Sequence, residues 1–140
     1  MKRYCCFILF SLLIWNHLKA DETPCSTDSC ARFEVLGEFL RDFGDVGNDA
    51  GSISSSFWLK STGTVPMIIL SNSTSCPCTQ VYYDKDIILP GDSVEVKLTY
   101  EPKSHLGYFL QSVLLKTNTV PEDYIRFYLK GTVVEAITRD

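Results

Sequence analysis

Two cysteines separated by a single proline are the residues whose types and spacing could do chemistry in this chain. Cys76 and Cys78 flank Pro77, so their thiols could close a disulfide. The ring of such a disulfide would be small and therefore strained, and strained disulfides are more easily reduced. Pro77 fixes its own φ and pushes Cys76 toward an extended conformation, which restricts the geometry of both sulfurs. The pair could be a structural disulfide, a redox-active pair, or a site for a soft metal such as Cu(I), which prefers thiolates.

The surroundings of the pair favour a structural role. Redox catalysis needs a base or a positive charge beside the thiols to lower their pKa, and no such residue adjoins the motif in sequence. His105 is the only histidine after residue 20, so further metal ligands are scarce. A four-thiolate zinc site would need Cys25 and Cys30 to fold back onto the motif, and their spacing is poor for zinc. We predict disulfides or thiol pairs among Cys25, Cys30, Cys76 and Cys78, with the connectivity open.

No set of residues has the pattern of a catalytic site. A triad of serine, histidine and acid would have to use His105 with an unsupported partner. The acidic residues are spread over expected turns and outer strand faces, without a pair whose spacing suggests matched acid and base roles. We therefore predict that the protein is not an enzyme and that it needs no cofactor.

Residues 1–20 have the pattern of a secretory signal peptide. Lys2 and Arg3 form a basic start, and residues 4–15 are almost wholly apolar. That run is too short for a membrane span of about 20 residues and typical of a signal-peptide core. Ala20 offers a small residue for cleavage, although a leucine and a lysine precede it, so an uncleaved signal anchor is the alternative. We expect a secreted or periplasmic protein with no transmembrane span in its mature part.

The mature chain is acidic. Removing residues 1–20 takes away three of the 13 bases and none of the 17 acids, which leaves a net charge of about −7. Binding to nucleic acid or to an anionic membrane needs clustered lysine and arginine, and no basic stripe is visible in the sequence. We therefore expect no nucleic-acid partner, and instead an unknown protein or a component of the cell envelope.

Alternating apolar and polar residues predict a series of strands after a polar linker over residues 21–30. The clearest strand is 94–100, in which every second side chain is valine, leucine or tyrosine, so one face is buried and the other is wet. No segment has a capped apolar repeat of 3.6 residues, so no long helix is expected. Further strand candidates are 31–36, 39–43, 53–60, 67–70, 81–83, 109–115 and 125–133, with turns at 45–52, 61–64, 89–92 and 117–123.

This spacing predicts an all-β, immunoglobulin-like β-sandwich of about seven strands over residues 31–134, followed by a tail at 135–140. A set of short motifs points the same way: Asp42-Phe43-Gly44, Phe57-Trp58-Leu59, Ser75-Cys76-Pro77-Cys78-Thr79, Ile88-Leu89-Pro90-Gly91, Gly107-Tyr108-Phe109 and Leu129-Lys130-Gly131-Thr132-Val133.

Through these motifs the chain resembles a family of small exported bacterial domains of unknown function, common in the Bacteroidetes. The family has a Ser-Cys-Gly-Cys-Thr signature and an immunoglobulin-like fold akin to hydin-type β-sandwiches. The chain departs from the family pattern at Pro77, where the signature has glycine, at Ser61 in place of asparagine, and at Ile87 in place of proline. The resemblance implies the fold and export, and it carries over no catalytic or ligand residue.

Two surfaces are candidates for contact with a partner. The first is the strand that follows the cysteine motif, where Tyr82 and Tyr83 could help to recruit an extended peptide by β-augmentation. The second is an apolar patch that Tyr108, Leu110, Leu114 and Tyr128 would form on the outer face of the last two strands, since exposed apolar clusters usually mark a partner surface. The competing explanation, which we favour, is that residues 31–36 cover this patch.

The sequence therefore predicts an exported binding or structural module. A sandwich presents loops and edge strands on a rigid core, so recognition needs no catalytic group. The alternative is a protein that handles thiols or copper through Cys76 and Cys78.

Overall fold

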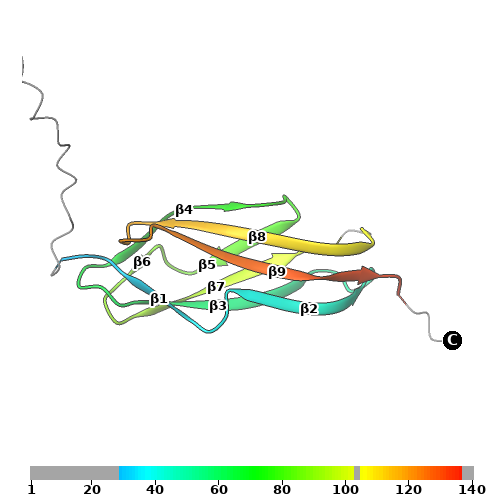
Figure 1. The fold of residues 1–140 in the computed structure, drawn as a ribbon, viewed down its shortest axis with the longest axis horizontal. Helices are drawn as coiled ribbons and strands as arrows, with labels where there is room; N and C mark the ends of the chain where they lie inside the picture. Colours follow the sequence, from blue (N-terminus) through cyan, green and yellow to red (C-terminus); the bar gives the residue numbers. More distant parts are fainter. Residues whose placement is uncertain (1–28, 103–104, 137–140) are drawn as a thin grey trace, which may run out of the picture.

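The structure, a computed structural model, describes residues 29–102 and 105–136 as two β-sheets packed face to face (Figure 1). The described residues contain no helix, and hence none long and apolar enough to cross a membrane. The predicted signal peptide, Cys25 and the end of the predicted tail lie outside the described residues. The strands are β1 Phe33–Leu36, β2 Leu40–Gly47, β3 Ile53–Ser61, β4 Met67–Thr74, β5 Thr79–Tyr83, β6 Ile87–Ile88, β7 Ser93–Tyr100, β8 Gly107–Thr117 and β9 Tyr124–Val134.

The four-stranded sheet has the order β1-β3-β7-β5, and the five-stranded sheet has the order β2-β9-β8-β4-β6. The all-β sandwich predicted from the sequence is confirmed. The number of strands in the described chain is nine rather than about seven. Each of the eight strand candidates overlaps a strand of the structure. The one strand without a candidate is β6, in which Ile87 and Ile88 pair with the start of β4.

The core lies between the sheets and follows the predicted alternation. In β7, Val94, Val96 and Leu98 are at most 1% exposed, because every second side chain of a strand points to the same face. They face Phe127 of β9, whose ring stacks on that of Phe57 with centroids 4.6 Å apart. The two inner faces thus bury the apolar side chains of each strand, and the outer faces are left accessible to a partner.

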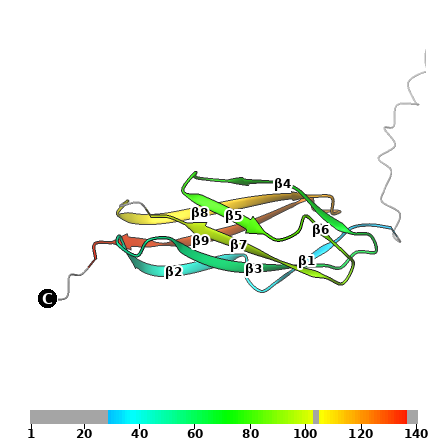
Figure 2. The ribbon, with the colours of Figure 1, turned by 180° about the vertical axis from the view of Figure 1, so that it is seen from behind.

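The N-terminal strands belong to different sheets. Strand β1 pairs antiparallel with β3, and β2 then pairs in parallel with β9; Figure 2 shows this change of layer from behind. The chain makes the change after Gly37, which has a φ of +112° that residues with a side chain rarely adopt. Strand β2 continues to Gly47, so the turn predicted at 45–52 begins too early. The reason is that pairing with β9 resumes after a bulge and buries Val46.

Local turn chemistry was predictable. Asp92 N donates a hydrogen bond to Leu89 O at 2.9 Å, and Gly91 has a φ of +87°, as a type II turn requires.

Strand β4 is longer than predicted, because its polar second half, Ser71 to Thr74, pairs with β8. That half lacks the apolar alternation from which the sequence analysis recognised strands.

Candidate functional site

The cysteine motif forms the crossing between the two sheets. Strand β4 ends at Thr74 in the five-stranded sheet, and β5 begins at Thr79 in the four-stranded sheet. Between them, the Cα atoms of Cys76 and Cys78 lie 5.1 Å apart and their sulfurs are within bonding distance. Cys78 N also donates to Cys76 Sγ at 3.1 Å. The motif is therefore a tight pair at a point where the chain changes layer.

Hydrogen bonds fix this crossing to both sheets. On one side, Ser75 N donates to Ser112 O and Ser112 N donates to Ser75 Oγ, both at 2.9 Å. The Ser75 hydroxyl donates in turn to Gln111 Oε1 at 2.9 Å. On the other side, Glu101 N donates to Cys78 O at 2.9 Å, just after β7 ends. The crossing therefore braces β8 against β7 and holds the start of β5 in place.

Cys30 lies at the opposite end of the sandwich. It is buried, and its carbonyl oxygen accepts a hydrogen bond from Thr64 N at 3.0 Å, close to the end of β3. The eight residues of β7 run between the two ends, which is roughly 25 Å of extended chain. Cys30 is therefore not beside Cys76 and Cys78. In the part of the chain that the structure describes, no group of three or more histidine, cysteine or acidic side chains could hold a metal ion.

The two tyrosines of β5 point in opposite directions. Strand β5 ends the four-stranded sheet and pairs only with β7 within it. Tyr82 is 68% exposed and lies across from Lys97 on the outer face. Tyr83 is half-buried against the core, and its hydroxyl accepts a hydrogen bond from Asn72 Nδ2 at 3.1 Å. Tyr82 is thus available to a partner, whereas Tyr83 fixes the edge strand to β4.

The apolar patch on β8 and β9 is open. Tyr108 is 67% exposed and Leu110 is 49% exposed, while Leu114 and Tyr128 are half-buried. The explanation that we favoured, coverage by residues 31–36, is wrong. Those residues form β1 at the edge of the other sheet, because Phe33 and Val35 find their apolar contacts in the core there.

Asp42 and Lys130 form an ion pair beside this patch, on the adjacent strands β2 and β9. Lys130 Nζ lies 3.1 Å from Asp42 Oδ2. The Asp42 pKa is lowered from its ordinary value of 3.8, first by the hydrogen bond that Gly44 N donates and next by the Lys130 side chain. Asp42 therefore remains ionised down to a more acidic pH than an unpaired aspartate. Its carboxylate lies at the edge of the apolar patch.

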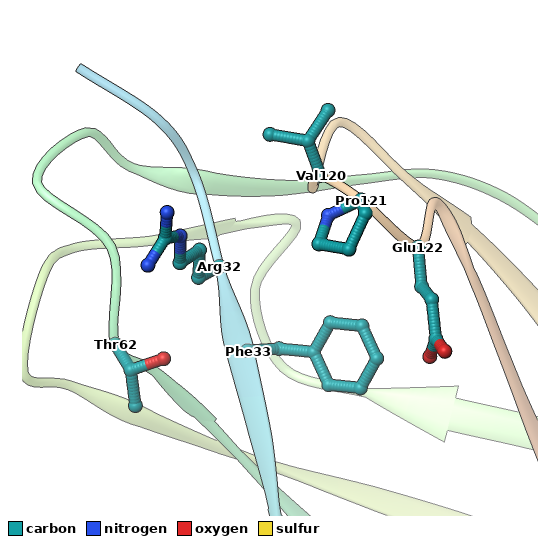
Figure 3. Close-up of a pocket in the computed structure, with 6 residues that line it drawn as sticks. All are labelled: Arg32, Phe33, Thr62, Val120, Pro121 and Glu122. Atoms are coloured by element: carbon teal, nitrogen blue, oxygen red, sulfur yellow. The ribbon is translucent and has the colours of Figure 1, made fainter. Parts of the chain in front are cut away.

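A shallow pocket that the sequence analysis missed lies where β1 meets the loop between β8 and β9. Its volume is about 220 Å³. In Figure 3, Arg32 and Glu122 lie on opposite sides of the Phe33 ring, with Pro121 above it. The residues meet because Val120 N donates to Ala31 O at 3.1 Å. Small-molecule sites usually have about 300–1,000 Å³, so we assign no ligand to this pocket.

The fold is similar to several solved structures. A protein of unknown function from Porphyromonas gingivalis W83 matches with a TM-score of 0.67 and 16% identity, over 77% of this chain and 49% of its own. The ASH/PapD-like domain 7 of human CEP192 matches with a TM-score of 0.59 and 16% identity, over 89% of this chain and 97% of its own. The VesB protease of Vibrio cholerae matches with a TM-score of 0.60 and 13% identity, over 74% of this chain and 32% of its own.

These likenesses show the fold alone, because one sandwich architecture hosts many unrelated functions. The chain spans about half of the Porphyromonas protein and about a third of the protease. No curated protein matches it. The family model described as a protein of unknown function, DUF1573, matches residues 37–133. This match covers most of the sandwich, and the chain belongs to the DUF1573 family.

Proposed function

We propose that this protein is an exported immunoglobulin-like binding module that takes an extended segment of another protein, or of an envelope component, onto the free edge of β5. The observation that carries the proposal is the position of β5, which ends its sheet and presents Tyr82 at 68% exposure. An edge strand offers unpaired backbone groups to which another strand can add. Binding of this kind needs no catalytic group.

The anchoring of β5 supports this function. The crossing at Cys76 and Cys78 fixes its start, and the hydrogen bond between Asn72 and Tyr83 fixes its end. A strand that is already held in its extended conformation loses little entropy when a partner adds to it. Export is the second part of the proposal, and it rests on the signal-like pattern of residues 1–20 and on an even number of cysteines after it.

Replacing Tyr82 by alanine is expected to weaken binding of a β5 ligand about tenfold, because exposed tyrosines are common hot spots of interfaces. A ligand can be obtained by selecting displayed random peptides on the folded protein. Its affinity for the wild type and for Tyr82→Ala can be measured by calorimetry, and amide chemical shifts map the site. We expect the shifts to cluster on residues 79–83.

Tyr108→Ala is the matched control. Tyr108 is 67% exposed, almost the same as Tyr82 at 68%, and it lies on the other sheet. It should leave the affinity for the same peptide unchanged. Equal losses in the two variants, or shifts that avoid β5, would refute the proposed site.

Cys76 and Cys78 are expected to form a structural disulfide that holds the crossing, and this gives a second prediction. Without reductant, alkylation and mass spectrometry should find neither thiol free, and mild reductant should not change this. Replacing both residues by serine should lower the free energy of unfolding by about 1–2 kcal/mol, the loop-closure contribution of so small a ring. The variant should bind peptide at β5 more weakly, since the start of the strand is less restrained.

The alternative, a protein that handles thiols or copper, makes the opposite prediction. The pair would be free in the purified protein and would take up one Cu(I) per chain, with loss of this uptake in the double serine variant. The position of Cys30 at the far end of β7 leaves the pair without a third thiolate from that residue.

A further inference from the structure

Strands β8 and β9 gather positive charges on their outer face. Along β9 the outward positions alternate tyrosine with a cation, in the order Tyr124, Arg126, Tyr128 and Lys130, and β8 adds Lys116. The antiparallel register places each cation across from a leucine or a tyrosine. This arrangement lies on the five-stranded sheet, away from β5. We define the β8–β9 face as the three cross-strand pairs Lys116–Tyr124, Arg126–Leu114 and Lys130–Leu110.

The β8–β9 face is accessible. Leu110 and Tyr124 are 49% and 47% exposed, and the side chains of Lys116 and Arg126 are exposed as well. Strand β1 does not cover the face, because it pairs with β3 in the other sheet. Apolar side chains that stay this open beside charged ones are typical of a surface that binds a partner.

The charge of this face is opposite to that of the rest of the chain. Three of the ten bases that follow residue 20 lie on it, and the outward positions of β8 and β9 carry no acidic residue. Lys130 pairs with Asp42 on the neighbouring strand, and Lys116 lies 5.6 Å from the centre of the Tyr124 ring. Arg126 stands between these two lysines along the outer side of the strand pair. The face thus attracts negative charge although the protein as a whole repels it.

We propose that the β8–β9 face binds an acidic, amphipathic segment of a partner protein, in which aspartate or glutamate alternates with apolar residues. Carboxylates of the partner pair with Arg126 and Lys116, and apolar side chains pack on Leu110 and Leu114. Arginine binds carboxylates through two parallel hydrogen bonds, and arginine and tyrosine are enriched at the centres of protein interfaces. The surface is separate from β5, so the chain has a second binding site.

A protein segment fits the face better than a polyanion does. Binding of nucleic acid or of an anionic polysaccharide rests on many adjacent cations. This face holds three cations, with Leu110 and Leu114 across from two of them and Tyr128 between Arg126 and Lys130. The apolar pair has no counterpart on a chain of repeating charges. A mature charge of about −7 also opposes the approach of a long polyanion.

The test is a selection of displayed short random peptides on the folded wild-type protein, with removal of those that also bind the variant Arg126→Glu. We expect the remaining peptides to carry several acidic residues interspersed with apolar ones. A synthetic copy should bind Arg126→Glu at least about tenfold more weakly than the wild type, the effect of removing an interface hot spot. Leu110→Ser should weaken binding of the same peptide, whereas Tyr82→Ala should leave its binding unchanged. This difference distinguishes the site from the one proposed on β5.

Lys97→Glu is the matched control, because Lys97 is an exposed strand position on the outer face of the opposite sheet and the change in net charge is the same. It should leave the affinity unchanged, and circular dichroism should show that both variants fold. Four results would overturn the proposal: selected peptides without acidic residues, equal losses in Lys97→Glu, equally tight binding of alginate or heparin to the face, or a wild-type dimer that Arg126→Glu dissolves.

Discussion

Replacing Phe127 by alanine is expected to lower the free energy of unfolding by about 3–5 kcal/mol, a large fraction of the 5–15 kcal/mol that typically stabilises a domain. Phe127 is fully buried, and its ring stacks on Phe57 at 4.6 Å between centroids. Removing the ring loses its transfer free energy and leaves a cavity that rigid strands on both sides cannot close. Urea unfolding followed by circular dichroism measures the loss.

Phe39→Ala is the matched control for this prediction. Phe39 also stacks on Phe127, with centroids 6.2 Å apart, but it is 49% exposed. The same atoms are removed, yet solvent already reaches the ring and fills the space, so the loss should stay within about 1–1.5 kcal/mol. Equal losses in the two variants would show that the contact between the sheets does not depend on the buried ring.

Much of this fold could be predicted from side-chain alternation. Strand β7 was recognised because its valines, Leu98 and Tyr100 occupy every second position, and all of them are buried in the structure. The turn before it was recognised because proline and glycine stand where a type II turn needs them. These signals are local, since they depend on residues that are adjacent in the chain.

The pairing of the strands could not be predicted in the same way. Nothing in the sequence near Gly37 indicates that β1 joins β3 and that β2 then joins β9 in parallel. Both strands offer apolar residues at alternate positions, and either sheet could bury them. Alternation alone therefore allows residues 31–36 to cover the last two strands, whereas in the structure Phe33 packs against the core at the edge of the other sheet.

The candidate sites show the same limit. Cys76 and Cys78 could be identified because a single residue separates them. That Tyr82 faces outward and Tyr83 inward follows from alternation within β5, so the two tyrosines differ in their accessibility to a partner. The pocket beside Phe33 could not be foreseen, because Pro121 reaches it from a loop almost ninety positions further along the chain.

Gly63→Ala is expected to be as damaging as a large core deletion, although residue 63 lies in a turn. A Cβ atom at Gly63 would overlap Cys30 O and lie 2.6 Å from Arg32 N. All of these neighbours are backbone atoms, which cannot rotate away as a side chain can. Overpacking usually costs about 1–3 kcal/mol and occasionally more, and we expect about 3 kcal/mol in urea unfolding.

The damage should be concentrated on β1. The hydrogen bonds from Thr62 N to Arg32 O and from Thr64 N to Cys30 O are both 3.0 Å long, and a shift of the turn breaks both. Amide exchange of β1 should therefore accelerate more than that of β7, which keeps its neighbours. Thr62→Ala, at an exposed position beside the glycine, adds no atom and should change neither measurement. If Gly63→Ala leaves β1 as protected as before, the close approach of the two backbones is not what holds this strand to the sheet.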